Sequence, residues 1–199
     1  MKNMSPFLIV LFAFSAFAQI IENPHVPEEL KKIEFLLGNW NTKEKYYGSS
    51  PEPYEGTMEI SFQKALSGTF LQGNYKGSMK RMGKHEDISF ITYFEGMLLI
   101  TYDNQSKKYR AWWFDVRWSD TPSMQPIELE GILEGNRLVF TSKPYSMPGM
   151  GDAIIRITYE KKNQNEVNFL LQTKGRGDFV KQIESVYTRG KTNLSVSSQ

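Results

Sequence analysis

Three charged side chains stand in stretches of the sequence where apolar and aromatic residues alternate with polar ones. They are Asp115, Arg156 and Glu184. A charge on the inward face of a β-strand is costly to bury unless it is paired or serves a ligand. We therefore predict that the three charges converge inside the fold, near Trp113 and Tyr102, and bind the polar end of a ligand. The alternative is that each is a surface charge in an ordinary ion pair, worth about 0 to 1 kcal/mol.

Two of these charges are carboxylates, Asp115 and Glu184, and a carboxylate pair can perform general acid and base catalysis. This interpretation gives an enzyme, an isomerase or a hydrolase, with the catalytic residues themselves left undefined because the sequence does not fix their separation. The chain has no cysteine and two histidines. It therefore offers no nucleophile with an evident base and no ligand spacing of the zinc type. An enzyme stands second to a binding protein.

Soft metal ligands occur at Met79-x-x-Met82-x-x-His85, with a further methionine pair at Met147 and Met150. Thioether sulfur and imidazole can bind copper. Methionines in loops rich in glycine and proline are more often flexible packing residues than ligands. We therefore expect no metal and no cofactor.

The charge balance points away from nucleic acid as a partner. The chain has 24 basic and 22 acidic side chains, and they are interleaved along the sequence, whereas nucleic-acid-binding domains carry a basic stripe. Aromatic residues make up 14% of the chain, and large rings line pockets as readily as they fill cores. The expected partner is a small hydrophobic or amphipathic molecule.

The elements that must position these residues are almost all strands. One short helix is predicted over 27–38, because proline and acidic residues open it and glycine closes it. After it come short runs of β-branched and aromatic residues, each ended by Gly, Asn, Asp or Pro. The predicted strands are 40–47, 56–64, 69–78, 87–94, 98–103, 109–118, 127–133, 137–142, 153–160, 167–173 and 179–188.

Strands without helices between them pair in antiparallel fashion. In a single open layer, so many strands would leave two long exposed edges. We therefore predict an all-β fold, a closed antiparallel β-barrel of about ten strands with one short N-terminal helix.

The first 18 residues have the order of a cleaved secretory signal. Lys2 precedes an apolar block from Phe7 to Phe14, and Ala16 and Ala18 flank the cleavage site. The apolar block is shorter than the roughly 20 residues that cross a bilayer, so no integral membrane segment is expected after cleavage. We expect residues 19–190 to form one barrel domain and residues 191–199 a flexible tail. A chain without cysteine, exported in this way, is expected to be periplasmic or secreted in a bacterium.

Two short motifs stand at the ends of the predicted barrel. Gly38-Asn39-Trp40 joins the helix to the first strand, and Tyr187-Thr188-Arg189 ends the last strand. The pair resembles the structural signature of the calycin superfamily, the lipocalins and fatty-acid-binding proteins, in which a basic residue of the last strand packs on the tryptophan. The resemblance implies that Gly38, Trp40 and Arg189 are structural, with Arg189 stacked on Trp40 for on the order of 1 kcal/mol.

A wider set of motifs is similar to an uncharacterised bacterial domain-of-unknown-function family with a lipocalin-like barrel. The set comprises residues 35–40, 98–103 and 107–109, Trp113 and the Tyr187-x-Arg189 ending. The resemblance bears on the fold and says little about activity. Some related barrels bind haem through a histidine, but His25 stands before the helix and His85 in a polar turn.

The function expected from these observations is an exported lipocalin-like barrel that binds a small apolar or amphipathic ligand in its cavity. Two alternatives stay open. One is an enzyme that uses internal carboxylates on the same barrel, and the other is a protein-interaction module with a filled barrel. The volume of the cavity separates the first two from the third.

Overall fold

The computed structural model describes residues 25–47, 53–82, 89–115, 126–147 and 151–190. Several predicted features lie outside the described residues. These are the signal segment 1–18, the tail 191–199, His85, Met150 and residues 116–118 of the strand predicted over 109–118.

Burial alternates along the strands, and this alternation gives the sheet an inner and an outer face. In β1 (Gly38–Tyr46) the side chains of Trp40, Thr42, Glu44 and Tyr46 are buried, and those between them are exposed. In β5 (Lys108–Asp115) the same period of two places four residues of the strand inside. Since successive side chains of a strand point to opposite faces, every such strand lines the core with one face and meets water with the other.

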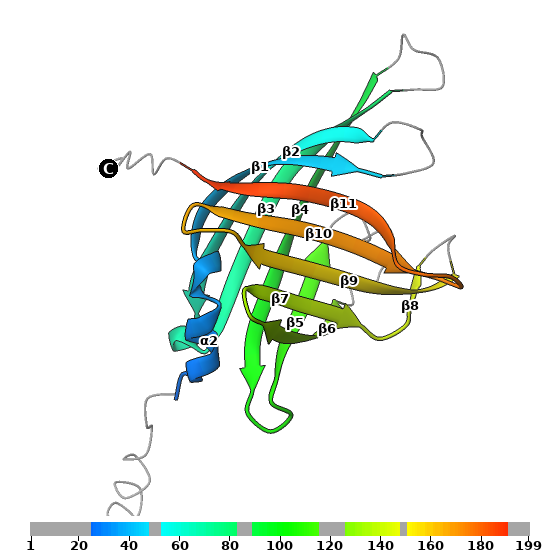
Figure 1. The fold of residues 1–199 in the computed structure, drawn as a ribbon. Helices are drawn as coiled ribbons and strands as arrows, with labels where there is room; N and C mark the ends of the chain where they lie inside the picture. The colour runs from blue at the N-terminus through cyan, green and yellow to red at the C-terminus, as the bar shows by residue number, and fades with distance from the viewer. Residues whose placement is uncertain (1–24, 48–52, 83–88, 116–125, 148–150, 191–199) are drawn as a thin grey trace, which may run out of the picture.

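The strands form one sheet that closes on itself (Figure 1). The remaining strands are β2 (Tyr54–Ala65), β3 (Phe70–Met82), β4 (Ser89–Asp103), β6 (Ile127–Glu134), β7 (Arg137–Ser142), β8 (Tyr145–Met147), β9 (Gly151–Lys161), β10 (Glu166–Lys174) and β11 (Val180–Arg189). Neighbours pair antiparallel in the order β10-β11-β1-β2-β3-β4-β5-β6-β7-β9, and pairing between β9 and β10 completes the ring. The prediction of an all-β, closed antiparallel barrel of about ten strands is confirmed.

Two features of the strand pattern differ from the prediction beyond small shifts of the strand ends. The strands predicted over 87–94 and 98–103 are one strand, β4, because Gly96 continues it instead of ending it. A Cβ at Gly96 would lie 2.1 Å from the Tyr75 hydroxyl oxygen, so this glycine allows close approach of the tyrosine. The short strand β8, which pairs with β9 outside the ring, was not predicted.

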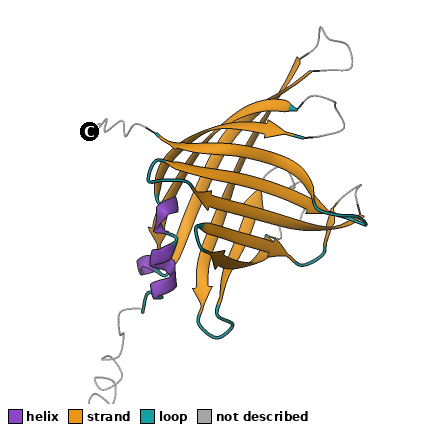
Figure 2. Ribbon diagram, viewed as in Figure 1, coloured by secondary structure: helices purple, strands orange, loops and turns teal. Residues whose placement is uncertain are grey.

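The N-terminal helix is shorter than predicted and covers one end of the barrel (Figure 2). It consists of α2 (Glu28–Lys32) and a separate 3-10 turn, η1 (Glu34–Leu36). Leu30, Ile33 and Leu36 are buried against the core. The Tyr109 hydroxyl of β5 donates a hydrogen bond to the Glu29 carbonyl at 2.8 Å, which ties the helix to the wall. Among the described residues, no helix is long and apolar enough to span a bilayer.

The first and last strands meet at this covered end through Trp40 and Arg189. The two residues are register partners, and the Arg189 Cζ atom lies 4.0 Å from the centroid of the Trp40 ring. Trp40 is buried and donates from Nε1 to the Leu36 carbonyl at 2.7 Å. Arg189 donates to the Leu37 carbonyl, and a Cβ at Gly38 would lie 2.2 Å from its guanidinium. The arginine therefore joins β1, β11 and the end of the helical segment.

Candidate functional site

Trp113 and Asp115 lie on the inner face of the barrel, at successive inward positions of β5. Each is 7% exposed. Tyr75 of β3 joins them, because its hydroxyl donates to the Asp115 carboxylate at 2.9 Å and accepts a hydrogen bond from Trp113 Nε1. The structure therefore brings together two of the predicted site residues and adds a tyrosine that sequence reasoning did not single out.

Arg156 and Glu184 lie on the outer face, so the predicted convergence of the three charges inside the barrel is wrong. Ile155 and Ile157 are buried, which turns Arg156 of β9 outward, where its Cζ atom lies 3.6 Å from the Phe179 ring centroid. Glu184 of β11 likewise lies between the buried Ile183 and Ser185. Because Asp115 faces the interior and Glu184 faces outward, these carboxylates cannot act together on one substrate inside the barrel.

Glu184 has its own partners on the outer face. It accepts hydrogen bonds from Lys181 Nζ at 2.5 Å and from the Tyr47 hydroxyl. The bond from Lys181, followed by the bond from Tyr47, lowers the pKa of the Glu184 carboxyl. Its surroundings are those of a surface ion pair.

Tyr102 lies near the covered end of the barrel, away from Asp115. Its ring packs edge-on against Tyr109, with 5.1 Å between centroids. Along β5, Tyr102 is paired with Tyr109 and Gly96 with Asp115, so Tyr102 is six positions along β4 from the level of Asp115, roughly 20 Å. Burial, with a smaller contribution from the charge of Glu29, raises the pKa of Tyr109 to about 12. The packed rings of Tyr102 and Tyr109 therefore close this end of the barrel, and their hydroxyls are neutral at ordinary pH.

A second carboxylate inside the barrel, Glu44, was missed by the sequence analysis. Glu44 is 2% exposed, and the Tyr46 hydroxyl donates a hydrogen bond to the Oε2 atom of Glu44. The signal was available, because the resemblance gives Trp40 a structural role under Arg189 and a period of two places Thr42 and Glu44 on the same face as Trp40. The charged neighbours Lys43 and Lys45 point outward and hide the pattern.

Two buried tyrosines, one on the strand next to β1 and one on β9, face the same space as Glu44. Tyr159 of β9 and Tyr187 of β11 are 4% and 3% exposed, and their ring centroids are 6.1 Å apart. Burial raises the pKa of both hydroxyls, and the nearby charge of Glu44 raises them further. Both groups therefore stay neutral and can donate or accept hydrogen bonds at ordinary pH.

These groups line an internal cavity of about 40 Å³. Apolar side chains such as Met58, Ile60 and Leu98 make up most of its wall, and its polar part comes from Glu44 and the three tyrosines Tyr75, Tyr159 and Tyr187. A volume of this size holds a few water molecules. It is far smaller than the roughly 300–1,000 Å³ of pockets for drug-sized ligands, so the cavity as it stands admits a ligand of only a few atoms.

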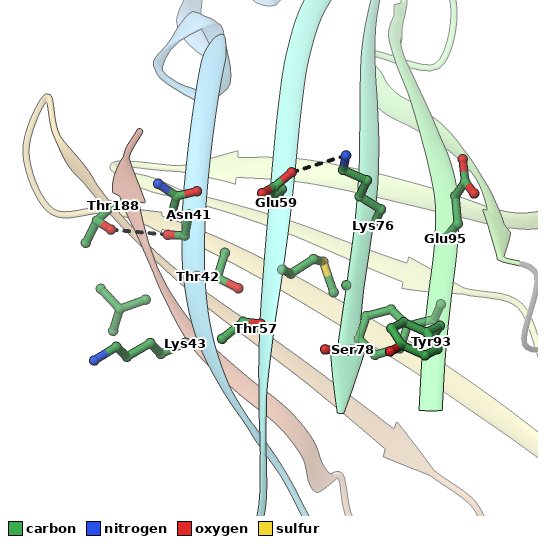
Figure 3. Close-up of a pocket in the computed structure, with 14 residues that line it drawn as sticks. Asn41, Thr42, Lys43, Thr57, Glu59, Lys76, Ser78, Tyr93, Glu95 and Thr188 are labelled. Carbon is green, nitrogen blue, oxygen red and sulfur yellow. Dashed lines mark hydrogen bonds and ion pairs between the residues drawn. The ribbon is translucent and has the colours of Figure 1, made fainter. Parts of the chain in front are cut away.

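A larger hollow, of about 1090 Å³, lies on the outside of the sheet (Figure 3). It is called the outer groove below, and β11, β1, β2, β3 and β4 form its floor. Pairing between β2 and β3 runs without a break from Glu55 and Lys80 to Ala65 and Phe70, so the groove does not open into the interior between these strands. The inner cavity is the candidate site, because its ionisable and hydroxyl groups are withdrawn from water.

No group of three or more potential metal-ligating His, Cys, Asp or Glu residues occurs within the described ranges. Of the methionines considered as ligands, Met79 packs against the core.

The barrel is closed and antiparallel, a helix covers one end, and a tryptophan–arginine contact joins the first and last strands. These features together define a lipocalin-like barrel of the calycin type. Residues 28–189 match a family described as protein of unknown function, DUF1579. The chain belongs to this family, and the predicted membership of an uncharacterised domain family is confirmed.

Two solved structures are similar to the chain at low sequence identity. One is Rv2717c from M. tuberculosis, 13% identical, covering 84% of this chain and 100% of that chain with a TM-score of 0.43. The other is the S-type phycobiliprotein lyase CPES from Guillardia theta, also 13% identical, covering 86% of this chain and 97% of that chain with a TM-score of 0.49. No curated protein matches the chain.

Proposed function

We propose that the protein is an exported barrel that binds a small apolar or amphipathic molecule in the cavity that the barrel encloses. The polar part of the molecule contacts five residues, here called the interior polar cluster. The cluster consists of Glu44, Tyr75, Asp115, Tyr159 and Tyr187. The observation that carries the proposal is that Glu44 and the phenols of Tyr75, Tyr159 and Tyr187 line a mostly apolar cavity, with Asp115 bonded to the Tyr75 hydroxyl beside it.

Stability alone does not account for such a cluster. Buried charges are expensive to remove from water even when they are paired, and apolar residues of similar volume in their place are often neutral or stabilising. Glu44 and Asp115 nevertheless occupy inward positions that Ile or Leu fill elsewhere in the barrel. Buried ionisable groups in a cavity are typical of functional sites. Recognition of a polar group on a ligand explains why they stand there.

The size of the cavity limits how the ligand is held. At about 40 Å³ it accommodates the polar group of a ligand in place of ordered water. A longer apolar body requires wall side chains to change rotamer. Met58 is suited to this, since it borders the cavity and methionine is unbranched and flexible. We propose that ligand binding enlarges the cavity on the side of Met58.

Export is part of the same proposal and is supported by the sequence of residues 1–18. A basic start, an apolar block and small residues before Gln19 are the features of a cleaved signal. The test is N-terminal sequencing of the protein from the periplasm or medium of a bacterium that expresses the full chain. A mature terminus at Gln19 supports export, and a protein that stays in the cytoplasm with Met1 intact refutes it.

Native mass spectrometry of the protein purified from its compartment tests the ligand. We expect a bound small molecule that is released when the protein unfolds. Glu44→Gln, which keeps the shape of the side chain, should reduce its occupancy by about tenfold, the effect of losing one charge-assisted hydrogen bond. Glu128→Gln is the matched control, because Glu128 is exposed and lines neither the cavity nor the larger hollow on the outside of the sheet. Occupancy that is equal in the two variants would show that the interior polar cluster does not bind the molecule.

The small volume of the cavity favours one alternative, a filled barrel that acts by binding another protein. In that case no small molecule accompanies the purified protein. Met58→Ala should then add empty space without creating affinity for any ligand. A bound molecule in the wild type excludes this alternative.

A further inference from the structure

We propose that the outer groove binds a neutral, polyhydroxylated chain such as a short glycan. The groove lies over two adjacent rows of outward-facing residues that cross five strands (Figure 3). One row, in register, is Thr188, Asn41, Glu59, Lys76 and Glu95. The next is Val186, Lys43, Thr57, Ser78 and Tyr93. The two hollows share Met58 in their lining, but the residues of these two rows point outward and none of them lines the interior cavity, so the proposal does not depend on the proposed function.

The side chains of the groove offer hydrogen-bond donors and acceptors in balance. Hydroxyl groups at Thr57 and Ser78 and the amide of Asn41 can each donate and accept. Two lysines and two carboxylates also line the groove, and one pair, Lys76 and Glu59, is in contact at 3.3 Å. The formal charge of the lining is therefore zero. A ligand rich in hydroxyl groups, without net charge, matches this inventory.

An aromatic ring stands at one end of the groove. Tyr93 of β4 is 76% exposed, the largest exposed fraction among the large hydrophobic side chains of the described residues. A ring of this kind gives a flat apolar surface with a polar tip. The Tyr93 ring can stack on the C–H face of a sugar ring. The side-chain hydroxyls of neighbouring groove residues can then form hydrogen bonds with the hydroxyl groups at the edge of the sugar.

The geometry of the groove fits an extended chain that lies across the strands. Neighbouring strands are about 4.8 Å apart, so the four intervals from β11 to β4 span about 19 Å. The floor of the groove at its centre is formed by small residues such as Thr57 and Ser78, which leaves a continuous path from Thr188 to Tyr93. Several sugar units in a row can occupy such a path.

Other extended partners fit less well. A peptide that adds a strand needs an open sheet edge, but β1, β2 and β3 are paired on both sides beneath the groove. Nucleic acid and anionic lipid need an excess of positive charge, and the groove has none. The balance of charge and the absence of an edge at this place select a neutral polar ligand.

The test is titration of the full-length, ¹⁵N-labelled protein with cellotetraose, maltotetraose and chitotetraose, each to about 10 mM, a range that detects Kd values of millimolar order. We expect at least one of them to shift amide resonances of the groove, including Ser78 and Thr57. Tyr93→Ala should raise the Kd by about tenfold, as expected when an aromatic contact is lost. Leu66→Ala is the control, because Leu66 is 69% exposed and lies outside the groove.

Three outcomes would overturn the proposal. The first is the absence of groove shifts with all three sugars. The second is a Kd that is the same in Tyr93→Ala and in the Leu66→Ala control. The third is a stronger shift of the same resonances by a neutral peptide, tetraalanine, which would identify the groove as a peptide site. A negative result in the interior ligand experiment leaves each of these readouts unchanged.

Discussion

Replacing Tyr187 by phenylalanine should make the folded barrel less sensitive to alkaline pH. Tyr187 is 3% exposed, and burial raises the pKa of its hydroxyl well above the usual value of 10, with Tyr159 and Glu44 adding to the effect. The folded state therefore keeps the phenol neutral at a pH where the unfolded chain ionises it. Since the unfolded chain then releases a proton that the folded chain retains, stability falls as pH rises above 10.

The size of the effect follows from the same linkage. At pH 11, one unit above the pKa of an unfolded tyrosine, each phenol that stays protonated in the folded state costs about 1.4 kcal/mol of stability. Tyr159 behaves in the same way, because burial raises its pKa as well. Removal of the Tyr187 hydroxyl should thus decrease the loss of stability between pH 8 and pH 11 by about 1.4 kcal/mol.

Urea unfolding at pH 8 and at pH 11, followed by tryptophan fluorescence, measures this difference. The variant also loses the contact between the Tyr187 and Tyr159 hydroxyls at every pH, so the quantity to compare is the change between the two pH values. Tyr93→Phe is the matched control, because the Tyr93 ring is 76% exposed and its hydroxyl meets water in both states. Equal losses in Tyr187→Phe and the wild type would refute the assignment of Tyr187 as a buried neutral phenol.

Three further perturbations test the covered end and the outer face. Trp40→Ala should lower the free energy of unfolding by about 3–5 kcal/mol, because it empties a large aromatic site; a melting temperature like the wild type's would contradict the role of Trp40. Gly38→Ala should destabilise the fold by at least about 1 kcal/mol, since φ is +106° and the new Cβ would lie 2.2 Å from Arg189; chemical denaturation measures it. Lys181→Ala should raise the pKa of Glu184, which Lys181 lowers. The stability that this pair adds is present at neutral pH and is lost as pH falls through the lowered pKa of Glu184, so NMR titration of the carboxyl and acid unfolding of the variant should both report the change.

The barrel could be predicted because its signals are local and repeated. Strand after strand alternates apolar and polar residues between turn residues, and a closed ring is a common way to bury so many strands. The main error in strand boundaries comes from a glycine whose role depends on a neighbouring strand. The sequence predicts a break between strands around Gly96, but this glycine lies within β4 opposite Tyr75, and only the tertiary contact distinguishes the two cases.

The inner site could be predicted only in part, because the choice of inner face depends on pairing. In the sequence both faces of β5 mix rings with a charge, and the faces of β9 and β11 that carry Arg156 and Glu184 also carry apolar residues such as Ile154 and Val186. The pattern therefore predicts Arg156 and Glu184 inside. The pairing of Trp40 with Arg189 corrects this for the last strand. Counting back from Arg189 by twos reaches Tyr187 on the inner face and leaves Glu184 on the outer. The bond between Tyr75 and Asp115 joins residues 40 apart and depends on the registers of three strands, which no local pattern gives.

Closure of the ring by its last strand also determines how the chain must assemble. The contact of Arg189 with Leu37 joins residues 152 apart, and contacts of such separation make folding slow. Until β11 is in place, β1 and β10 keep unpaired edges that can join the strands of other molecules. A nascent chain therefore has exposed edges in every state that precedes docking of β11, and its vulnerability to aggregation ends with that late step.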